Sequence, residues 1–173
     1  MIETLFLDTD CLSTFLVVRR ENLITRLYHG RIGIPRQVYL ELRKAHFLMK
    51  KVNDLVQRKL MPIYSIEMGT ESADLYQKMI SKPDRGYLQI GSGEAAAIVL
   101  TKQNNGILGS NNMSDVKQYI TRYNLKHRTS ADILKEALSH RLINEGQGNA
   151  LWKEMLNRNR KLPCSTFSEF LER

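Results

Sequence analysis

Short apolar runs alternate with longer amphipathic stretches along the chain, and this alternation predicts an α/β protein. The run at residues 3–7 ends abruptly in Asp8, and such a run suits a strand that is buried on both faces, as in a parallel sheet. Further segments share this short, apolar or extended character: residues 31–35, 61–66, 107–108 and 125–128.

The segments between these strands have helical spacing. Apolar residues recur at helical intervals over residues 37–60, which predicts one long amphipathic helix with a break near Lys50. Residues 11–18 predict a shorter helix, for which Asp10 or Ser13 is available as the N-cap. The remaining helices are expected at residues 21–28, 70–80, 94–101, 131–142 and 145–159, with one more that ends near Tyr123 and a short one after Pro163.

This order of elements predicts a three-layer α/β/α sandwich around a central, mostly parallel sheet of four to five strands. A chain of 173 residues, 42% of them hydrophobic, is long enough to bury a sizeable core. Because no repeat, linker or low-complexity segment divides the sequence, we expect a single domain over residues 1–173, with a helical C-terminal extension from about 130 to 173.

The positive charge is concentrated in one part of the chain. Residues 19–59 contain eleven lysines and arginines against three acids, which accounts for the whole formal net charge of +8. Such a segment is typical of a protein that binds a polyanion such as nucleic acid, although cations also simply solubilise surface helices. The candidate nucleic-acid contacts are Arg19, Arg20, Arg26, Arg31, Arg36, Arg43 and Lys44.

Cysteine content and hydropathy predict the cellular compartment of the protein. Cys11 and Cys164 are the only cysteines, and two thiols in a domain of this size favour a reduced, cytoplasmic protein. The longest uninterrupted apolar stretch, Ala95 to Leu100, is far shorter than the ~20 residues that cross a bilayer. We therefore expect no membrane partner.

Four acids interrupt the apolar patterns at positions that the fold could bring together. Asp8 follows the first strand, at the edge where open parallel sheets place their ligand sites. Glu41 shares the apolar stripe of its helix, Glu94 opens an apolar helix, and Asp115 follows the strand at residues 107–108. Each acid also has a structural explanation, as a strand end, a solvated helix residue, a first-turn acid or a capping residue.

Four converging carboxylates would need a counter-charge. Carboxylates within ~4–6 Å of one another raise each other's pKa, and burial penalises the ionised form further. A hard divalent cation removes this cost because it prefers carboxylate oxygens as ligands. The four histidines are scattered and none forms a zinc-like pair, so the pattern favours Mg²⁺ or Mn²⁺.

Four segments that contain these acids resemble, in order and spacing, the motifs of PIN-domain nucleases, a family that includes the toxin components of bacterial toxin–antitoxin pairs. The segments are Leu5–Asp10, Ile34–Leu42, Gly93–Ile98 and Ile107–Asp115. The resemblance implies that Asp8, Glu94 and Asp115 are metal-site acids and that Glu41 acts from the same cluster, often through bound water. Asn112 stands where many relatives have an acid, and it could give the cation one neutral oxygen.

The resemblance also implies an activity and partners. The activity is hydrolysis of RNA phosphodiester bonds at a carboxylate-bound Mg²⁺ or Mn²⁺ centre, giving 5′-phosphate and 3′-hydroxyl ends. The basic segment would hold the RNA strand. A protein antitoxin is a further candidate partner. From the residues themselves, Trp152 with the helices after Glu145 is a candidate homodimer surface, and a core role for Trp152 fits the sequence at least as well.

Two alternatives remain open from the sequence. Because Asn112 adds no charge, the chain could be a catalytically weak or inactive PIN-like module that binds RNA or a protein. The second alternative rests on Asp8-Thr9-Asp10, which also resembles the first motif of haloacid-dehalogenase-like phosphatases, with Asp8 as the nucleophile.

Overall fold

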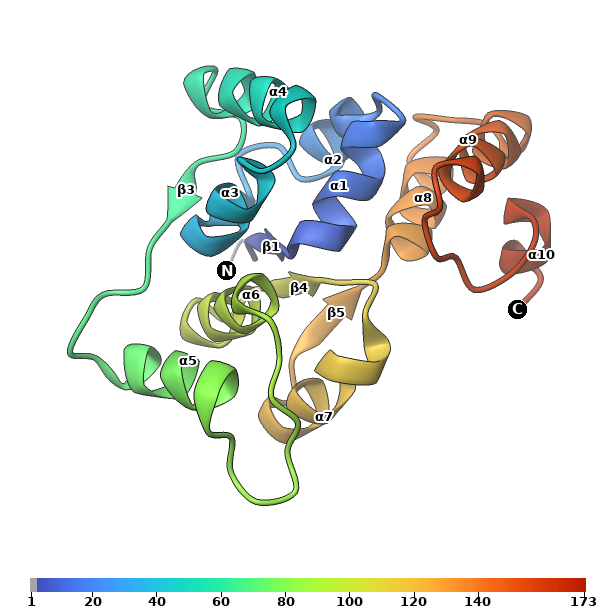
Figure 1. Ribbon diagram of the computed structural model, residues 1–173. Helices are drawn as coiled ribbons and strands as arrows, with labels where there is room; N and C mark the ends of the chain where they lie inside the picture. Colours follow the sequence, from blue (N-terminus) through green and yellow to red (C-terminus); the bar gives the residue numbers. More distant parts are fainter. Residues whose placement is uncertain (1–2) are drawn as a thin grey trace.

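Five short strands form one parallel sheet in the computed structural model, which describes residues 3–173 (Figure 1). The strands are β1 (Leu5–Leu7), β2 (Ile32–Pro35), β3 (Ile63–Tyr64), β4 (Ile107–Gly109) and β5 (Lys126–Arg128). Their order across the sheet is β3-β2-β1-β4-β5, and every neighbouring pair is parallel. The prediction of a mostly parallel sheet of four to five strands is confirmed.

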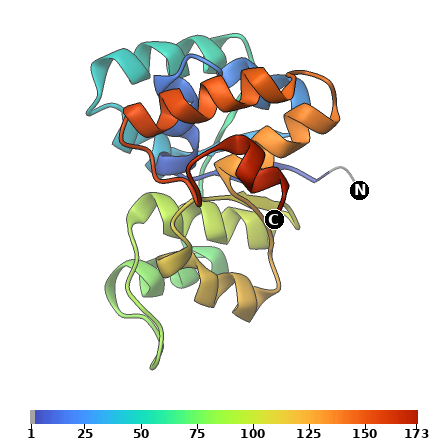
Figure 2. The same cartoon turned by 90° about the vertical axis from the view of Figure 1, so that its right-hand side faces the viewer.

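Helices cover both faces of this sheet (Figures 1 and 2). One face carries α5 (Glu71–Ser81), α6 (Ser92–Gln103) and α7 (Met113–Tyr123), which share the smaller hydrophobic core. The other face carries the larger core and the remaining helices: α1 (Thr9–Val17), α2 (Glu21–Leu27), α3 (Arg36–Leu42), α4 (His46–Gln57), α8 (Ser130–Ser139), α9 (Glu145–Asn157) and α10 (Phe167–Leu171). The result is the expected three-layer α/β/α sandwich.

The central strand β1 is buried on both faces, as its continuous apolar sequence predicts. Leu5 and Leu7 belong to the larger core, whereas Phe6 points to the opposite face because successive side chains of a strand alternate. A Cβ atom at Gly33 of β2 would lie 2.5 Å from the Phe6 ring. Glycine at this position therefore lets the Phe6 ring lie against the neighbouring strand.

Two local predictions were wrong. The helix expected over residues 37–60 is two helices, α3 and α4, and the chain is interrupted before Ala45 rather than near Lys50. Ala45 has extended backbone angles and is the N-cap of α4. The prediction missed this turn because the apolar spacing continues across it and the turn contains no glycine or proline. The N-cap of α1 is Asp8, whose Oδ1 accepts from the Cys11 amide at 2.8 Å, and neither Asp10 nor Ser13 takes this role.

The C-terminal helices α8, α9 and α10 pack on the α1 side of the sheet (Figure 2). Trp152 of α9 is fully buried against Phe167 and Phe170, and its indole Nε1 donates to the Cys164 carbonyl oxygen at 2.9 Å. Trp152 therefore belongs to the core and does not form a dimer surface. Within residues 3–173, every helix is too short or too polar to span a bilayer.

Candidate active site

Asp8 lies at the carboxyl end of β1, beside the end of β4. Its amide donates to the Gly109 carbonyl oxygen at 2.9 Å, and its side chain is only 1% exposed. One carboxylate oxygen caps α1, whereas Oδ2 is buried and has no hydrogen-bond partner among the described residues. Burial raises the pKa of Asp8 to about 7, against the opposing effects of the Ser110 hydroxyl and the Cys11 amide; the charge of Asp10 raises it further. Asp8 is thus a desolvated carboxylate, and within residues 3–173 only its Oδ1 meets a donor in hydrogen-bond geometry.

Glu41 joins three helices at this edge of the sheet. Its Oε1 accepts from the Ser92 hydroxyl at 2.7 Å and from the Gly93 amide at 2.9 Å, while its Oε2 accepts from the Thr9 hydroxyl. A Cβ atom at Gly93 would lie 2.7 Å from Glu41 Oε2 and 2.8 Å from Thr9 Oγ1, so only glycine allows this approach. Glu41 therefore fixes the amino ends of α1 and α6 relative to the end of α3.

Glu94 and Asp115 come together through Asn112. The Asn112 side-chain amide nitrogen donates to Glu94 Oε1 at 2.7 Å and to Asp115 Oδ2 at 2.8 Å. The second Glu94 oxygen accepts from the Gly91 amide at 3.1 Å, which also satisfies a free donor at the start of α6. Burial raises the pKa of Glu94, and the charges of Asp115 and Glu41 add to this effect. Asn112 thus stands between two carboxylates as a neutral donor.

Asp10 is a site residue that sequence reasoning considered mainly as a helix cap. Its Oδ2 accepts from Asn111 Nδ2 at 3.1 Å, and Arg160 Nη1 lies 3.5 Å from its Oδ1. Asn111 also links the site to α8, because its Oδ1 accepts from the Ser130 amide at 2.8 Å. The spacing of Asp8 and Asp10 in the sequence could have indicated Asp10 as a site residue. No local sequence pattern indicates Arg160.

Two cavities adjoin at these acids, and we call them together the acidic cleft. The smaller cavity, about 330 Å³, is lined by residues that include Asp8, Asp10, Glu41 and Glu94. The larger, about 480 Å³, is lined by residues that include Asp10, Glu94 and Asn112. Asp10 and Glu94 line both cavities. Three of the four predicted acids, Asp8, Glu41 and Glu94, line the acidic cleft, whereas Asp115 lines neither cavity and is bonded to Asn112.

A family model described as a PIN domain matches residues 4–173. The chain belongs to the PIN-domain family. The same architecture occurs in DNA-bound VapBC from Salmonella typhimurium, a chain of which has a TM-score of 0.54 and 13% sequence identity over 74% of this chain and 98% of that chain. At this identity the likeness shows the fold alone. No curated protein has significant sequence similarity to this PIN domain.

The match places the chain in a nuclease-type family over almost its whole length, which leaves the phosphatase alternative without support. No group of three or more histidine, cysteine, aspartate or glutamate side chains within residues 3–173 has the arrangement of a metal site. The chemistry of the residues nevertheless fits a hard cation, because Asp8 Oδ2 is buried without a donor and the surrounding acids are oxygen ligands. The same donor set does not suit zinc.

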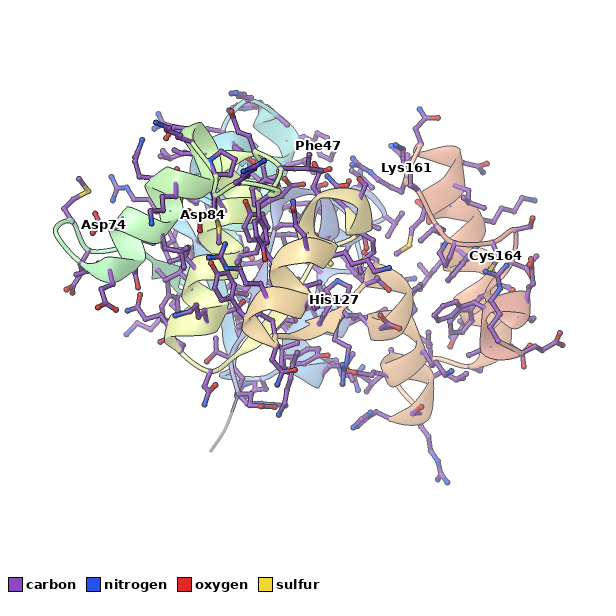
Figure 3. The ribbon with its side chains drawn as sticks, turned by 90° about the horizontal axis from the view of Figure 1, so that it is seen from below. Phe47, Asp74, Asp84, His127, Lys161 and Cys164 are labelled. Atoms are coloured by element: carbon purple, nitrogen blue, oxygen red, sulfur yellow. The ribbon has the colours of Figure 1, made fainter. Side chains whose placement is uncertain are left out.

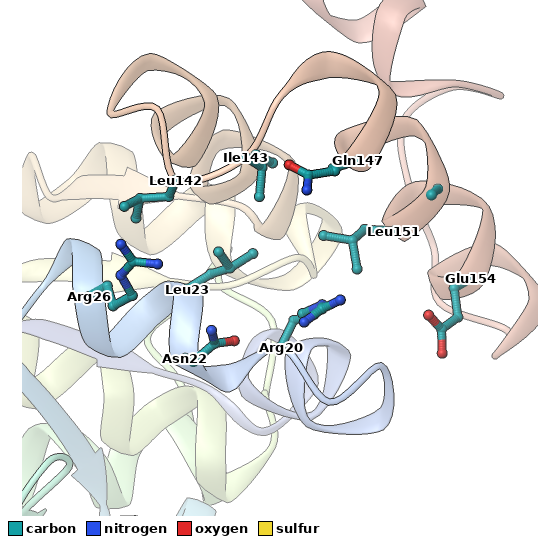
Figure 4. Close-up of a pocket in the computed structure, with 10 residues that line it drawn as sticks. Arg20, Asn22, Leu23, Arg26, Leu142, Ile143, Gln147, Leu151 and Glu154 are labelled. Atoms are coloured by element: carbon teal, nitrogen blue, oxygen red, sulfur yellow. The ribbon is translucent and has the colours of Figure 1, made fainter.

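The basic residues of the PIN domain fall into two groups. Arg19 and Arg20 follow α1 at its far end, ~15 Å along the helix from Asp8 for a rise of ~1.5 Å per residue. Arg20 and Arg26 line a separate cavity of about 350 Å³ against the α8–α9 connection (Figure 4), and Arg31 precedes β2 at the opposite edge of the sheet.

The second group lies nearer to the acids. Arg36 begins α3, and Arg43 and Lys44 follow directly after its end, two and three residues beyond Glu41. All three side chains are exposed. This group is therefore nearer to Glu41 along the chain than the first group is, although none of its three members lines either cavity of the acidic cleft.

Proposed function

We propose that this PIN domain is a Mg²⁺- or Mn²⁺-dependent ribonuclease that hydrolyses RNA phosphodiester bonds at the acidic cleft. The observation that carries the proposal is the Asp8 carboxylate, which is buried beside the cleft and has one oxygen without a hydrogen-bond partner among residues 3–173. A buried ionised carboxylate with a donor on only one of its oxygens is costly unless a cation pairs with it. Its position at the carboxyl edge of a parallel sheet is the usual place for a ligand site.

In this proposal Asp8, Glu94 and Asp115 hold the cation. Asn112 adds a neutral oxygen only if its amide turns, because its nitrogen faces the two carboxylates and its Oδ1 accepts from the Ser114 hydroxyl at 2.7 Å. A bound divalent cation supplies Lewis acidity for activating water and for stabilising charge on the phosphate. Glu41 acts as a positioning residue of the cluster. It accepts three hydrogen bonds, and these hold Thr9 and the start of α6 against the end of α3. The exposed cations Arg36, Arg43 and Lys44 attract the RNA backbone toward the cleft.

The test is cleavage of single-stranded RNA by the full chain in Mn²⁺, in Mg²⁺ and in a chelator. Asp8→Asn is the preferred variant because asparagine can still cap α1 while it removes the charge. We expect cleavage only with metal, 5′-phosphate products, and loss of activity in the variant, whereas Asp74→Asn on exposed α5 leaves activity unchanged. Undiminished cleavage by Asp8→Asn, or cleavage in chelator, contradicts the proposal.

The second candidate function is a PIN module that binds RNA or a protein without cleaving. Asn112 favours it, because a neutral amide already bridges Glu94 and Asp115 and reduces the need for a cation there. RNA retention that is independent of metal, together with no cleavage in either metal, supports this alternative. Metal-dependent cleavage excludes it.

Protein partners form a separate part of the proposal. One structural neighbour is DNA-bound VapBC from Salmonella typhimurium, and we propose a protein partner of antitoxin type for this chain as well. A homodimer remains a prediction that light scattering of the purified chain tests, since a dimer has twice the mass of the monomer.

A further inference from the structure

Two cations lie in the acidic cleft, and both come from one short segment after α9. Arg160 lines the smaller cavity and Lys161 lines the larger (Figure 3 labels Lys161). Among residues 3–173, no other lysine or arginine lines either cavity, including those of the basic segment at residues 19–59. The positive charge within the cleft therefore comes from the C-terminal part of the chain.

The segment that carries these cations is held at both ends. Asn159 adopts left-handed backbone angles with φ of 58°, and its amide donates to the Leu156 carbonyl oxygen at 2.9 Å. The Arg160 amide donates to the Met155 carbonyl oxygen at 3.0 Å, which completes a Schellman motif that ends α9. Beyond it, the Trp152 indole fixes the Cys164 carbonyl. The two cations thus project from an anchored turn.

The Arg160 guanidinium is incompletely satisfied by the protein. Within the described residues only Nη1 has partners: Ser13 Oγ at 3.2 Å and Asp10 Oδ1 at 3.5 Å, the latter long against the ~2.9 Å usual for such bonds. Its Nε is buried and has no partner. A guanidinium has five donors in a planar fork that matches the oxygens of a phosphate, so an anionic ligand in the cleft would complete its bonding.

We propose that Arg160 and Lys161 bind phosphate oxygens of the RNA strand and place the scissile phosphate beside Asp8 and Glu94. This inference rests on the proposed function, because it assigns the substrate contacts of the same cleft. Two adjoining cavities that share Asp10 and Glu94, each with one cation, suit a ligand that repeats its negative charge along a strand. The carboxylates of the cleft repel a free anion. An RNA strand that is bound by both cations would still keep its phosphates beside these carboxylates.

The experiment measures binding of a fluorescent single-stranded RNA to the full chain by anisotropy, in chelator to prevent cleavage and over a series of salt concentrations. Arg160→Ala and Lys161→Ala are each expected to weaken binding roughly ten-fold, because a charged hydrogen bond is lost. Each is also expected to lower the slope of log affinity against log salt by about 0.7, the value for one phosphate contact on a single strand. Lys153→Ala, an exposed cation of α9 that lines neither cavity, is the matched control and keeps the slope.

Two further variants separate binding from folding. Arg160→Lys keeps the charge without the fork, so we expect it to restore the salt slope and only part of the affinity. Lys161 is exposed, and its alanine variant is expected to have the melting temperature of the parent, so its binding result stands whatever happens to Arg160→Ala. Unchanged affinity and slope in both alanine variants, or tighter binding by Arg160→Ala, overturns the inference.

Cleavage assays distinguish this failure from failure of the proposed function. If the parent chain cleaves RNA with metal and both alanine variants have the KM of the parent, the proposed function stands and the inference is overturned. If the parent chain does not cleave RNA but the alanine variants show the expected slope changes, the hydrolytic function is overturned and the proposed RNA contacts stand.

Discussion

Replacing Asp8 by asparagine should stabilise the metal-free protein, and the gain should depend on pH. The pKa of Asp8 is raised from 3.8 to about 7, chiefly by burial. A difference of roughly three pKa units between the folded and unfolded chains corresponds to ~4 kcal/mol, at ~1.36 kcal/mol per unit. Because the folded pKa is the higher one, the favourable contribution of protonated Asp8 is complete below pH 3.8 and is lost as the pH rises through about 7. The ionised Asp8 carboxylate therefore lowers the free energy of unfolding of the parent chain at pH 8 but not at acid pH.

The assay is thermal unfolding of parent and Asp8→Asn in chelator at pH values from 4 to 8. For a domain of this size ~1 kcal/mol shifts the melting temperature by ~2–4 °C, so the variant should melt ~8–16 °C higher at pH 8 and close to the parent at pH 4. Asparagine retains the oxygen that caps α1, so the helix is not lost. Asp74→Asn, an exposed acid of α5, should show no such pH dependence.

Adding Mn²⁺ should remove the difference. A ligand that binds only the folded chain raises its stability, so millimolar Mn²⁺ at pH 8 is expected to raise the melting temperature of the parent and leave that of Asp8→Asn nearly unchanged. A variant that is no more stable than the parent at pH 8, or a gain that is equal at every pH, refutes the reasoning that desolvation of Asp8 is costly.

Three more substitutions test other contacts of the site. Asn112→Asp should lower the melting temperature in chelator, because a third carboxylate joins the two that Asn112 bridges, and should raise metal affinity in calorimetry. Gly93→Ala should cost ~1–3 kcal/mol in urea unfolding, because its Cβ meets Glu41, whereas Gly91→Ala should cost less since its Cβ has only an ordinary contact at 3.5 Å. Glu41→Gln should lower stability by ~1 kcal/mol or more, because an amide nitrogen replaces an oxygen that accepts a bond.

Much of the fold could be predicted because β1 to β4 are short and mostly apolar, whereas β5 is the polar run Lys126–Arg128. The run before Asp8 marked β1, and the placement of an acid directly after it marked the site edge. The turn between α3 and α4 could not be predicted, because the apolar spacing continues through Ala45 without a helix-breaking residue. The N-cap of α1 could not be predicted either, because Asp8 caps it through its side chain and Asp10 and Ser13 are nearby residues of the same capping type.

Three of the acids that line the cleft could be picked out from the sequence, whereas the contacts of Asp10 and of the cations depend on tertiary packing. Glu41, Glu94 and Asp8 were identified because they interrupt apolar patterns, and the structure brings them to one cleft. Arg160 meets Asp10 across 150 positions of sequence through the packing of α9, so no spacing rule could reveal it. Asn112 was noted as a missing acid, but only the structure shows its amide nitrogen between two carboxylates.

The distance in sequence between the acids and the cations of the cleft has a consequence for biosynthesis. Domains acquire structure from the amino end as translation proceeds. Asp8 and Asp10 therefore leave the ribosome long before Arg160 and Lys161 are polymerised, and a nascent chain that stops short of α9 has the acids without the anchored turn. Under the proposed function, the RNA contacts assigned to this turn therefore become available only late in synthesis.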